Sequence, residues 1–233
     1  MNNLTLCESN KLFYKKYLYK ISFSNQLNFI FRTELQKSKL SYTREKLDEY
    51  TELYRLGEPL MRKIFRTEVR MPENDYLDAK EIYNKLKQAN DYKIRIDPNS
   101  SITIFSNNDL FLKDIAKVLK TKNIKFYGPN PKYIDYLQTQ TKVILVDTVP
   151  TLPYKVNFNN KRCNGKDFAR WVRANEDKAK LGKIALENLE EYGYLNGFYM
   201  YVRDEKVLNL VTLLVGATIR NIEKLVYKGD IDK

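Results

Sequence analysis

Short runs of alternating apolar and polar residues recur along this chain, and runs with the 3.6-residue period of a helix lie between them. One order of elements occurs twice. Its first copy has strands at residues 92–96 and 102–105, a helix that opens in the cap-rich residues 106–109, and a returning strand at residues 124–127. This order predicts an α+β fold with mixed or antiparallel sheets covered by helices.

The second copy lies near the end of the sequence. A strand at residues 198–202 leads through the N-cap candidate Asp204 into a helix over residues 207–215. A strand then returns at residues 219–227. The first helix has an N-cap candidate at Asp109, so the two copies carry acidic residues at equivalent helix starts.

A further strand at residues 154–158 has the same pattern as residues 92–96, and a helical insertion at residues 166–192 separates it from the second copy. Two related strand–strand–helix–strand lobes explain this match, and so do two independent α+β segments. Pro150 and Pro153 interrupt the chain before it and mark a boundary. The expected segments are a basic N-terminal α+β segment (1–90), a strand–strand–helix–strand lobe (91–150) and a second similar lobe with the insertion (151–233).

The N-terminal segment begins with a strand pair at residues 13–32 that turns at Ser24 and Asn25. Residues 63–70 have the pattern of one strand and residues 75–88 that of a helix.

Charge and the absence of one residue type limit the function. The 233 residues include 41 Lys and Arg, 29 Asp and Glu and no histidine, which gives a net charge of +12. Histidine is the side chain whose unperturbed pKa lies near neutral pH and the commonest metal ligand, so its absence removes most hydrolase and metalloenzyme arrangements. We therefore expect a non-enzymatic, anion-binding protein without a metal or other cofactor.

The positive charge is uneven along the chain. Residues 11–70 carry a net charge of +7, residues 71–147 carry +2, and residues 148–233 carry +4. A surface that binds a polyanion should therefore use the two ends of the sequence.

The first candidate binding segment is the N-terminal strand. Its alternation puts Tyr14, Lys16 and Lys20 on one face, where they could stack on a base and contact phosphates, and Arg32 follows in the same strand pair. The alternative is an amphipathic strand whose lysines face water.

The second candidate is the helical insertion. Two helices and a following β-segment resemble a winged helix-turn-helix in outline, and Arg170 and Arg173 share one helix face. The alternative is a solvated helical hairpin, with Trp171 as a packing anchor. The expected contact residues here are Lys161, Arg162, Arg170, Arg173, Lys178 and Lys183.

A magnesium-dependent nuclease is a third possibility, because carboxylates lie at predicted strand ends. Helix capping explains two of them without a metal. The glycines form neither a P-loop nor a dinucleotide fingerprint. The carboxylates concerned are Asp97, Asp109, Asp147, Asp204 and Glu205.

The sequence thus predicts a sequence-tolerant nucleic-acid-binding protein that uses Lys and Arg phosphate contacts and aromatic stacking. Lys outnumbers Arg 29 to 12, which favours an AT-rich genome such as that of a phage or virus. The alternative is a structural or adaptor subunit of a virion or ribonucleoprotein assembly, with an acidic protein partner or an apolar contact through residues 207–215.

The expected setting is a reducing, cytoplasmic compartment, which would be the host cytoplasm for a phage or virus. Cys7 and Cys163 are too few and too distant for a disulfide framework. The longest near-apolar run, residues 207–219, is shorter than the roughly 20 residues that span a bilayer, so we expect no membrane partner.

Overall fold

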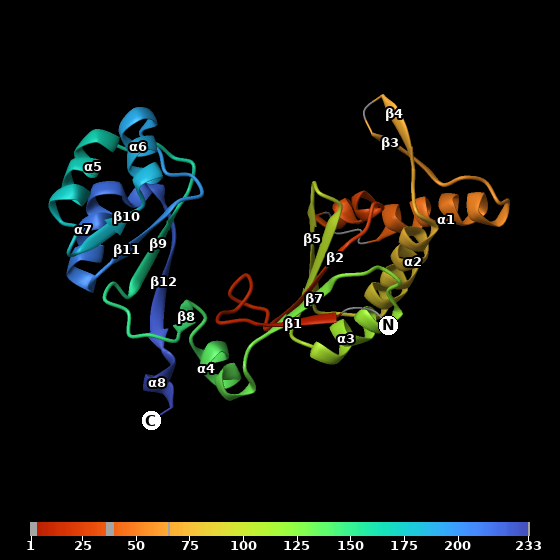
Figure 1. Cartoon of the computed structure of the whole chain (residues 1–233), viewed down its shortest axis with the longest axis horizontal. Coiled ribbons are helices and arrows are strands. Elements are labelled where there is room, and N and C mark those ends of the chain that lie inside the picture. Colours follow the sequence, from red (N-terminus) through yellow and green to blue (C-terminus); the bar gives the residue numbers. More distant parts are fainter. Residues whose placement is uncertain (1–3, 36–39, 65, 233) are drawn as a thin grey trace. The chain divides into compact units, whose positions relative to one another are not determined.

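The computed structural model describes residues 4–35, 40–64 and 66–232. The chain divides into two compact units, Met1–Gln138 and Thr139–Lys233 (Figure 1). Within the described residues, the strands form two five-stranded sheets and one two-stranded sheet. Helices pack against the larger sheets, so the predicted α+β class with mixed and antiparallel sheets is confirmed.

The sheet of the first unit has the strand order β1-β7-β2-β6-β5. β1 is parallel to β7, and the other neighbouring strands are antiparallel. Both the expected 1–90 segment and the expected 91–150 lobe contribute strands to it. Its strands are β1 (Leu4–Glu8), β2 (Tyr19–Ser24), β5 (Tyr92–Asp97), β6 (Ser101–Ser106) and β7 (Ile124–Gly128).

One face of this sheet packs on helices and forms the core of the unit. Ile21 and Ile104 are fully buried together with Ile82, Leu86 and Ile115 of the helices. The remaining elements are η1 (Asn28–Leu35), α1 (Ser41–Arg55), α2 (Glu73–Gln88), α3 (Asp109–Val118), η2 (Pro131–Tyr133) and α4 (Ile134–Thr139), which begins in this unit.

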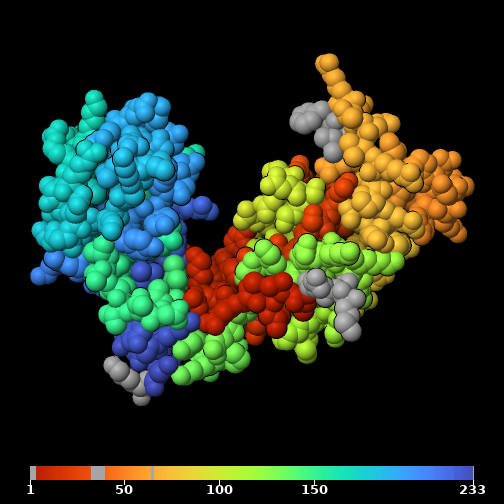
Figure 2. Space-filling view, viewed as in Figure 1, coloured from red at the N-terminus to blue at the C-terminus, as the bar shows by residue number. Residues whose placement is uncertain are grey.

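A short hairpin extends from the body of the first unit. It consists of β3 (Met61–Ile64) and β4 (Thr67–Arg70), which pair in antiparallel fashion, and residues 66–70 are exposed (Figures 1 and 2). The single strand expected at residues 63–70 is therefore wrong, because the chain reverses inside that range.

The sheet of the second unit has the order β10-β11-β9-β12-β8. Helices cover the face that bears Val156, Met200 and Val202, which are buried against Phe168 and Val211. Its elements are β8 (Val143–Val146), β9 (Tyr154–Phe158), α5 (Gly165–Ala174), β10 (Ala179–Leu181), α6 (Lys183–Tyr192), β11 (Tyr199–Val202), α7 (Glu205–Val215), η3 (Gly216–Thr218), β12 (Ile219–Tyr227) and α8 (Lys228–Ile231).

The two larger sheets have the same topology. Read from the parallel edge, the orders are β1-β7-β2-β6-β5 and β8-β12-β9-β11-β10. In each sheet the first strand is parallel to the last, and the other neighbours are antiparallel. A helix, α3 or α7, precedes the last strand. The units are therefore two versions of one arrangement. In each, a segment inserted after the central strand, β2 or β9, supplies the edge strand, β5 or β10.

This topology changes the expected correspondence between the copies. The strand at residues 154–158, β9, occupies the position of β2, whereas the pattern had matched it to residues 92–96. Local alternation cannot separate these possibilities because strand partners are chosen by non-local contacts.

Two further expectations about strands are wrong. Residues 28–35 form the 3₁₀ helix η1 rather than a strand, since Leu27, Ile30 and Phe31 are all buried at a helical spacing. In the insertion, residues 179–181 form β10 rather than the start of a helix. Ala179 and Leu181 are buried there, and Lys180 between them is exposed.

The helix starts partly match expectation. Asp204 caps α7, because its carboxylate accepts a hydrogen bond from Val207 N at 2.9 Å. The cap of α3 is Asn108 instead of Asp109, and Asn108 Oδ1 accepts from Phe111 N at 3.0 Å. Asp109 lies inside the helix and forms an ion pair with Lys113, one turn along.

Gly165 tests the packing between α5 and α6. A Cβ atom at this position would overlap the carbonyl oxygen of Leu189, whereas one at Gly182 would meet nothing within 4 Å. We expect Gly165→Ala to lower the free energy of unfolding of the second unit by about 1–3 kcal/mol, the usual cost of overpacking. Urea titration followed by the fluorescence of Trp171, the one tryptophan in the chain, measures this. Equal midpoints for Gly165→Ala and the control Gly182→Ala would contradict the packing argument.

Asp78 gives a prediction about pH. Its buried carboxylate accepts from Lys120 N at 2.6 Å and Thr121 N at 2.9 Å. Burial raises its pKa, and these two hydrogen bonds oppose the shift. Such a group contributes stability that is present below its unfolded pKa and is lost as pH rises through its folded pKa. The difference in unfolding free energy between wild type and Asp78→Ala should therefore shrink from about pH 4 to pH 7, by circular dichroism in urea. A difference that is constant or grows with pH would show that burial does not dominate.

Candidate nucleic-acid interface

The sheet of the first unit has an outer face, opposite the face that packs on helices. Ile21, Ile104 and Phe126 point toward the helices and belong to the core. Because side chains alternate along a strand, their neighbours in sequence point to the outer face. The core therefore determines which residues the outer face presents.

One row of this outer face combines lysines with aromatic rings. Lys93 on β5 pairs with Phe105 on β6, Phe105 pairs with Lys20 on β2, and Lys20 pairs with Tyr127 on β7. The four side chains therefore lie side by side across four strands. We call this set the first row.

The residues before β2 fold onto the first row. Phe13 N donates to Tyr17 O at 2.8 Å and Tyr17 N donates to Phe13 O at 2.9 Å, which closes a tight turn. The rings of Phe13, Tyr14 and Tyr17 lie 5.7, 4.9 and 6.4 Å from the Phe105 ring, between centroids. Phe105 is consequently only 4% exposed.

The first strand of the pair expected at residues 13–32 is therefore wrong for residues 13–17. Tyr14 and Lys15 have φ angles of 53° and 59°, which no strand accommodates. The turn nevertheless brings the Tyr14 ring against Phe105, which pairs with Lys20 in the first row. Lys16 points elsewhere.

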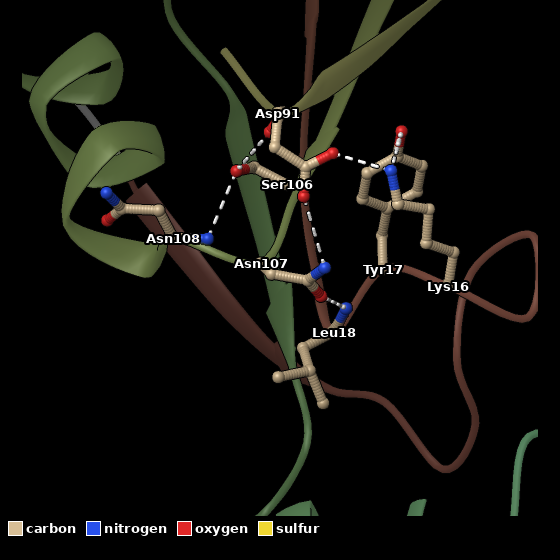
Figure 3. Close-up of polar contacts among 7 residues, drawn as sticks. All are labelled: Lys16, Tyr17, Leu18, Asp91, Ser106, Asn107 and Asn108. Carbon is tan, nitrogen blue, oxygen red and sulfur yellow. Dashed lines mark hydrogen bonds and ion pairs between the residues drawn. The ribbon is translucent and has the colours of Figure 1, made fainter. Parts of the chain in front are cut away.

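Polar contacts hold this turn against the end of the sheet (Figure 3). Lys16 Nζ lies 2.6 Å from the carboxylate of Asp91, and Asn107 Nδ2 donates to the same carboxylate at 3.4 Å. Asn107 Oδ1 accepts from Leu18 N at 3.0 Å, directly before β2. The hydrogen bond to Asp91 raises the pKa of Lys16, with a smaller part from Tyr17. The contacts of Lys16 are thus those of an anchor for the turn.

The ammonium groups of the first row lie on aromatic rings. Lys20 Nζ is 4.0 Å from the centre of the Tyr127 ring and 4.9 Å from that of Phe13, and Lys93 Nζ is 4.3 Å from that of Tyr14. Such cation–π contacts hold the charges in place while leaving them able to attract an anion.

Lys20 is in an unusual electrostatic position. Burial lowers its pKa, and the positive charge of Arg95 lowers it further. Arg95 itself forms an ion pair with Asp97 at 2.8 Å, but both side chains are accessible to water, which weakens the pair. A bound anion would offset the repulsion between Lys20 and Arg95 and stabilise the charged form of Lys20.

A groove of about 1090 Å³ lies along the edge strand β5. Its described lining residues include basic and aromatic side chains and no Asp or Glu. Tyr14 and Arg32, two residues predicted from the sequence, are among them. The basic lining residues are Arg32, Arg44, Lys87, Lys93 and Arg95, and the aromatic ones are Tyr14, Tyr17, Phe31, Tyr83 and Tyr92.

The contact residues predicted in and before the insertion lie in the second unit. They lie on or near the helices that cover the core-facing side of its sheet. Several of them contact carboxylates. Arg170 lies 3.4 Å from Asp167, Arg173 lies 2.9 Å from Glu190, and Lys183 lies 4.0 Å from Glu187. Lys178 donates to Asn175 at 3.3 Å, and Lys161 and Arg162 are exposed before α5. Trp171 stacks on the buried Phe168, with centroids 5.8 Å apart.

Sequence reasoning missed the basic residues of β5 and their aromatic neighbours. Residues 92–96 and 102–105 were identified as strands, but Lys93, Arg95 and Phe105 were not chosen as contacts. The available signal was the alternation itself, since Ile94 and Ile96 are partly buried against the core and leave Lys93 and Arg95 on the outer face.

Within the residues that the structure describes, no group of three or more His, Cys, Asp or Glu side chains could hold a metal ion. No helix in the same residues is long and apolar enough to cross a membrane. Comparisons with protein-family models, curated proteins and solved structures found no match.

The anchoring role of Asp91 can be tested by proteolysis. Asp91→Ala removes the acceptor of Lys16 and Asn107, so residues 13–17 should open more often. We expect trypsin to cleave after Lys15 or Lys16 several times faster than in wild type, as measured by mass spectrometry of a time course. Asp114→Ala, which removes an ion pair on α3, is the control and should leave this cleavage unchanged. Equal cleavage in the two variants would show that other contacts hold the turn.

Proposed function

We propose that the chain is a non-enzymatic protein that binds single-stranded nucleic acid along the groove beside β5. The observation that carries this proposal is the lining of that groove, which combines five basic and five aromatic side chains without a carboxylate among its described residues. Single strands are bound in this way elsewhere, since cations follow the phosphates and rings stack on unpaired bases.

The geometry supports a polymer rather than a small ligand. The volume of the groove, about 1090 Å³, exceeds the roughly 300–1,000 Å³ of small-molecule pockets. Tyr14 is exposed at one side of it, and Lys93 and Arg95 follow along β5. Stacking on Tyr14 with phosphates near Lys93 and Arg32 would be tolerant of sequence, because every base has an aromatic face.

The primary test is fluorescence anisotropy with labelled single-stranded DNA, duplex DNA and RNA at two salt concentrations. The variant is Lys93→Glu/Arg32→Glu. Because the charges of two side chains proposed to contact phosphates are reversed, the affinity for all single strands should fall by tenfold or more. The dependence of binding on salt should become less steep.

The matched control is Lys80→Glu/Lys122→Glu, which changes the net charge equally at exposed lysines of the same unit outside the groove. It should lose much less affinity. Equal losses in the two double variants, or equal binding of an acidic polymer and nucleic acid, would overturn the proposed groove.

The helical insertion is tested separately. Arg170→Glu/Arg173→Glu should lower the affinity for all sequences alike if residues 166–192 contact phosphates. Their ion pairs are exposed and can exchange for phosphate contacts at little cost. Unchanged binding would remove the insertion from the interface.

A second candidate function is a structural or adaptor subunit of a larger assembly. It is favoured by one observation, the exposed apolar side of α7. Leu213 is 84% exposed and Leu210 and Leu214 are also exposed, while Val207 and Val211 are buried. Exposed apolar groups of this kind favour association.

If this side of α7 joins two copies of the chain, sedimentation velocity at micromolar concentration should show a dimer, and Leu213→Lys should be a monomer with unchanged nucleic-acid binding. A wild-type monomer would remove self-association from consideration.

A further inference from the structure

The outer face of the second unit repeats the pattern of the first row. Lys180 on β10 pairs with Tyr201 on β11, and Tyr201 pairs with Lys155 on β9. These strands occupy the positions of β5, β6 and β2. A lysine, an aromatic residue and a lysine therefore cross the three corresponding strands in both units. We call Lys180, Tyr201 and Lys155 the second row.

The helix caps align the two rows independently of the strand register. Phe105 lies three residues before Asn108, the cap of α3, and Tyr201 lies three residues before Asp204, the cap of α7. The aromatic residue thus has the same place between strand and helix in each unit. In both cases it also lies on the side of the sheet opposite the core.

We propose that the second row, together with Tyr199 two residues before Tyr201 on β11, is a second binding site for single-stranded nucleic acid, in which a base stacks on Tyr199 or Tyr201 and a phosphate lies near Lys180. This inference rests on the proposed function of the first unit. It adds a site made of residues that sequence analysis did not select as contacts.

The local geometry suits a base. The rings of Tyr199 and Tyr201 meet edge to face with centroids 5.4 Å apart, and Lys155 Nζ lies 4.1 Å from the centre of the Tyr199 ring. A cavity of about 420 Å³ opens beside these rings and is also lined by Lys180. Its remaining lining residues are Pro150, Thr151, Leu152, Gly182 and Leu225.

The segment before the central strand explains how the two sites differ. In the first unit, the aromatic turn at residues 13–17 covers Phe105. In the second unit, residues 150–152 occupy the corresponding place before β9 and line the cavity without an aromatic ring. Tyr201, the counterpart of Phe105, is only partly buried, and Tyr199 beside it is 45% exposed. A base from outside could therefore supply the ring that the first unit obtains from its own turn.

The lysines favour an anionic occupant, and the exposed tyrosine ring favours one with a flat aromatic group. The exposed Lys180 lies at one side of the cavity, and Lys155 is held over Tyr199. A nucleotide satisfies both features, because its phosphate pairs with an ammonium group and its base stacks on tyrosine. An acidic peptide would use the lysines but leave the rings without a partner.

The experiment uses the full chain and oligonucleotides of about six residues, short enough to occupy one site. Oligothymidylate and oligouridylate that carry a photoreactive iodinated base are bound, irradiated and mapped by mass spectrometry, and the stoichiometry is measured by calorimetry. The expected result is two oligonucleotides per chain, with crosslinks at Tyr199 or Tyr201 as well as in the first unit. The two oligonucleotides distinguish DNA from RNA.

The variant Tyr199→Ala should weaken the second binding event about tenfold and remove its crosslink. Tyr199→Phe, which keeps the stacking ring, should restore both. Tyr192→Ala is the matched control, because Tyr192 is 51% exposed on α6, outside the cavity. Unchanged Trp171 fluorescence in all variants shows that the second unit is folded.

The outcomes separate this inference from the proposed function. One oligonucleotide per chain, with crosslinks confined to residues 13–105, overturns the second site and leaves the groove beside β5 intact. If the variant Lys93→Glu/Arg32→Glu loses one binding event but keeps the Tyr199 crosslink, the result supports two independent sites. Displacement of the oligonucleotide from Tyr199 by an equal charge concentration of polyglutamate overturns the second site, and an absence of all binding overturns both proposals.

Discussion

The burial of one sheet face in each unit is the interaction on which the rest of the structure depends. Burial of a side chain such as Ile21, Ile104 or Val156 contributes roughly 1.5–3 kcal/mol, and these residues recur at every second position of their strands. A shift of one residue in strand pairing would move all of them to water. The same constraint places Lys20, Phe105 and their counterparts on the opposite side, so the hydrophobic core fixes the arrangement of the charged residues.

That division also explains the electrostatics of the outer faces. Lysines in mid-strand would ordinarily extend into water, but Lys20 and Lys155 lie over tyrosine rings. The rings attract these ammonium groups, and Lys155 also faces Glu223 on β12, while Arg173 and Lys183 on the helical side pair with carboxylates. Lysines over aromatic rings therefore occur on both outer sheet faces, and carboxylates such as Asp97 and Glu223 lie on strands of the same sheets.

Sequence patterns predicted the elements better than their partners. The strands at residues 92–96 and 102–105 and the cap at Asp204 follow from local rules, and the structure contains them. The position of β9 in its sheet, the strand β10 and the 3₁₀ helix η1 depend on distant contacts that alternation does not encode. The residues of the candidate site were likewise predicted better than the contacts between them. Tyr14 and Lys20 were expected on one face of a strand, but Tyr14 lies in a turn against Phe105, and Lys20 lies over the ring of Phe13.

The common topology has a consequence for how such a chain could diversify. Both insertions leave the sheet after its central strand and return through an edge strand, although one contains η1, α1, the β3–β4 hairpin and α2 and the other contains α5 and α6. The strands around that point keep their order in both cases. The scaffold therefore separates a segment whose length and content differ between the two units from a row of side chains whose spacing is held by backbone pairing. A different insert would leave the lysine–aromatic–lysine spacing unaltered, because that spacing depends only on the pairing of the strands.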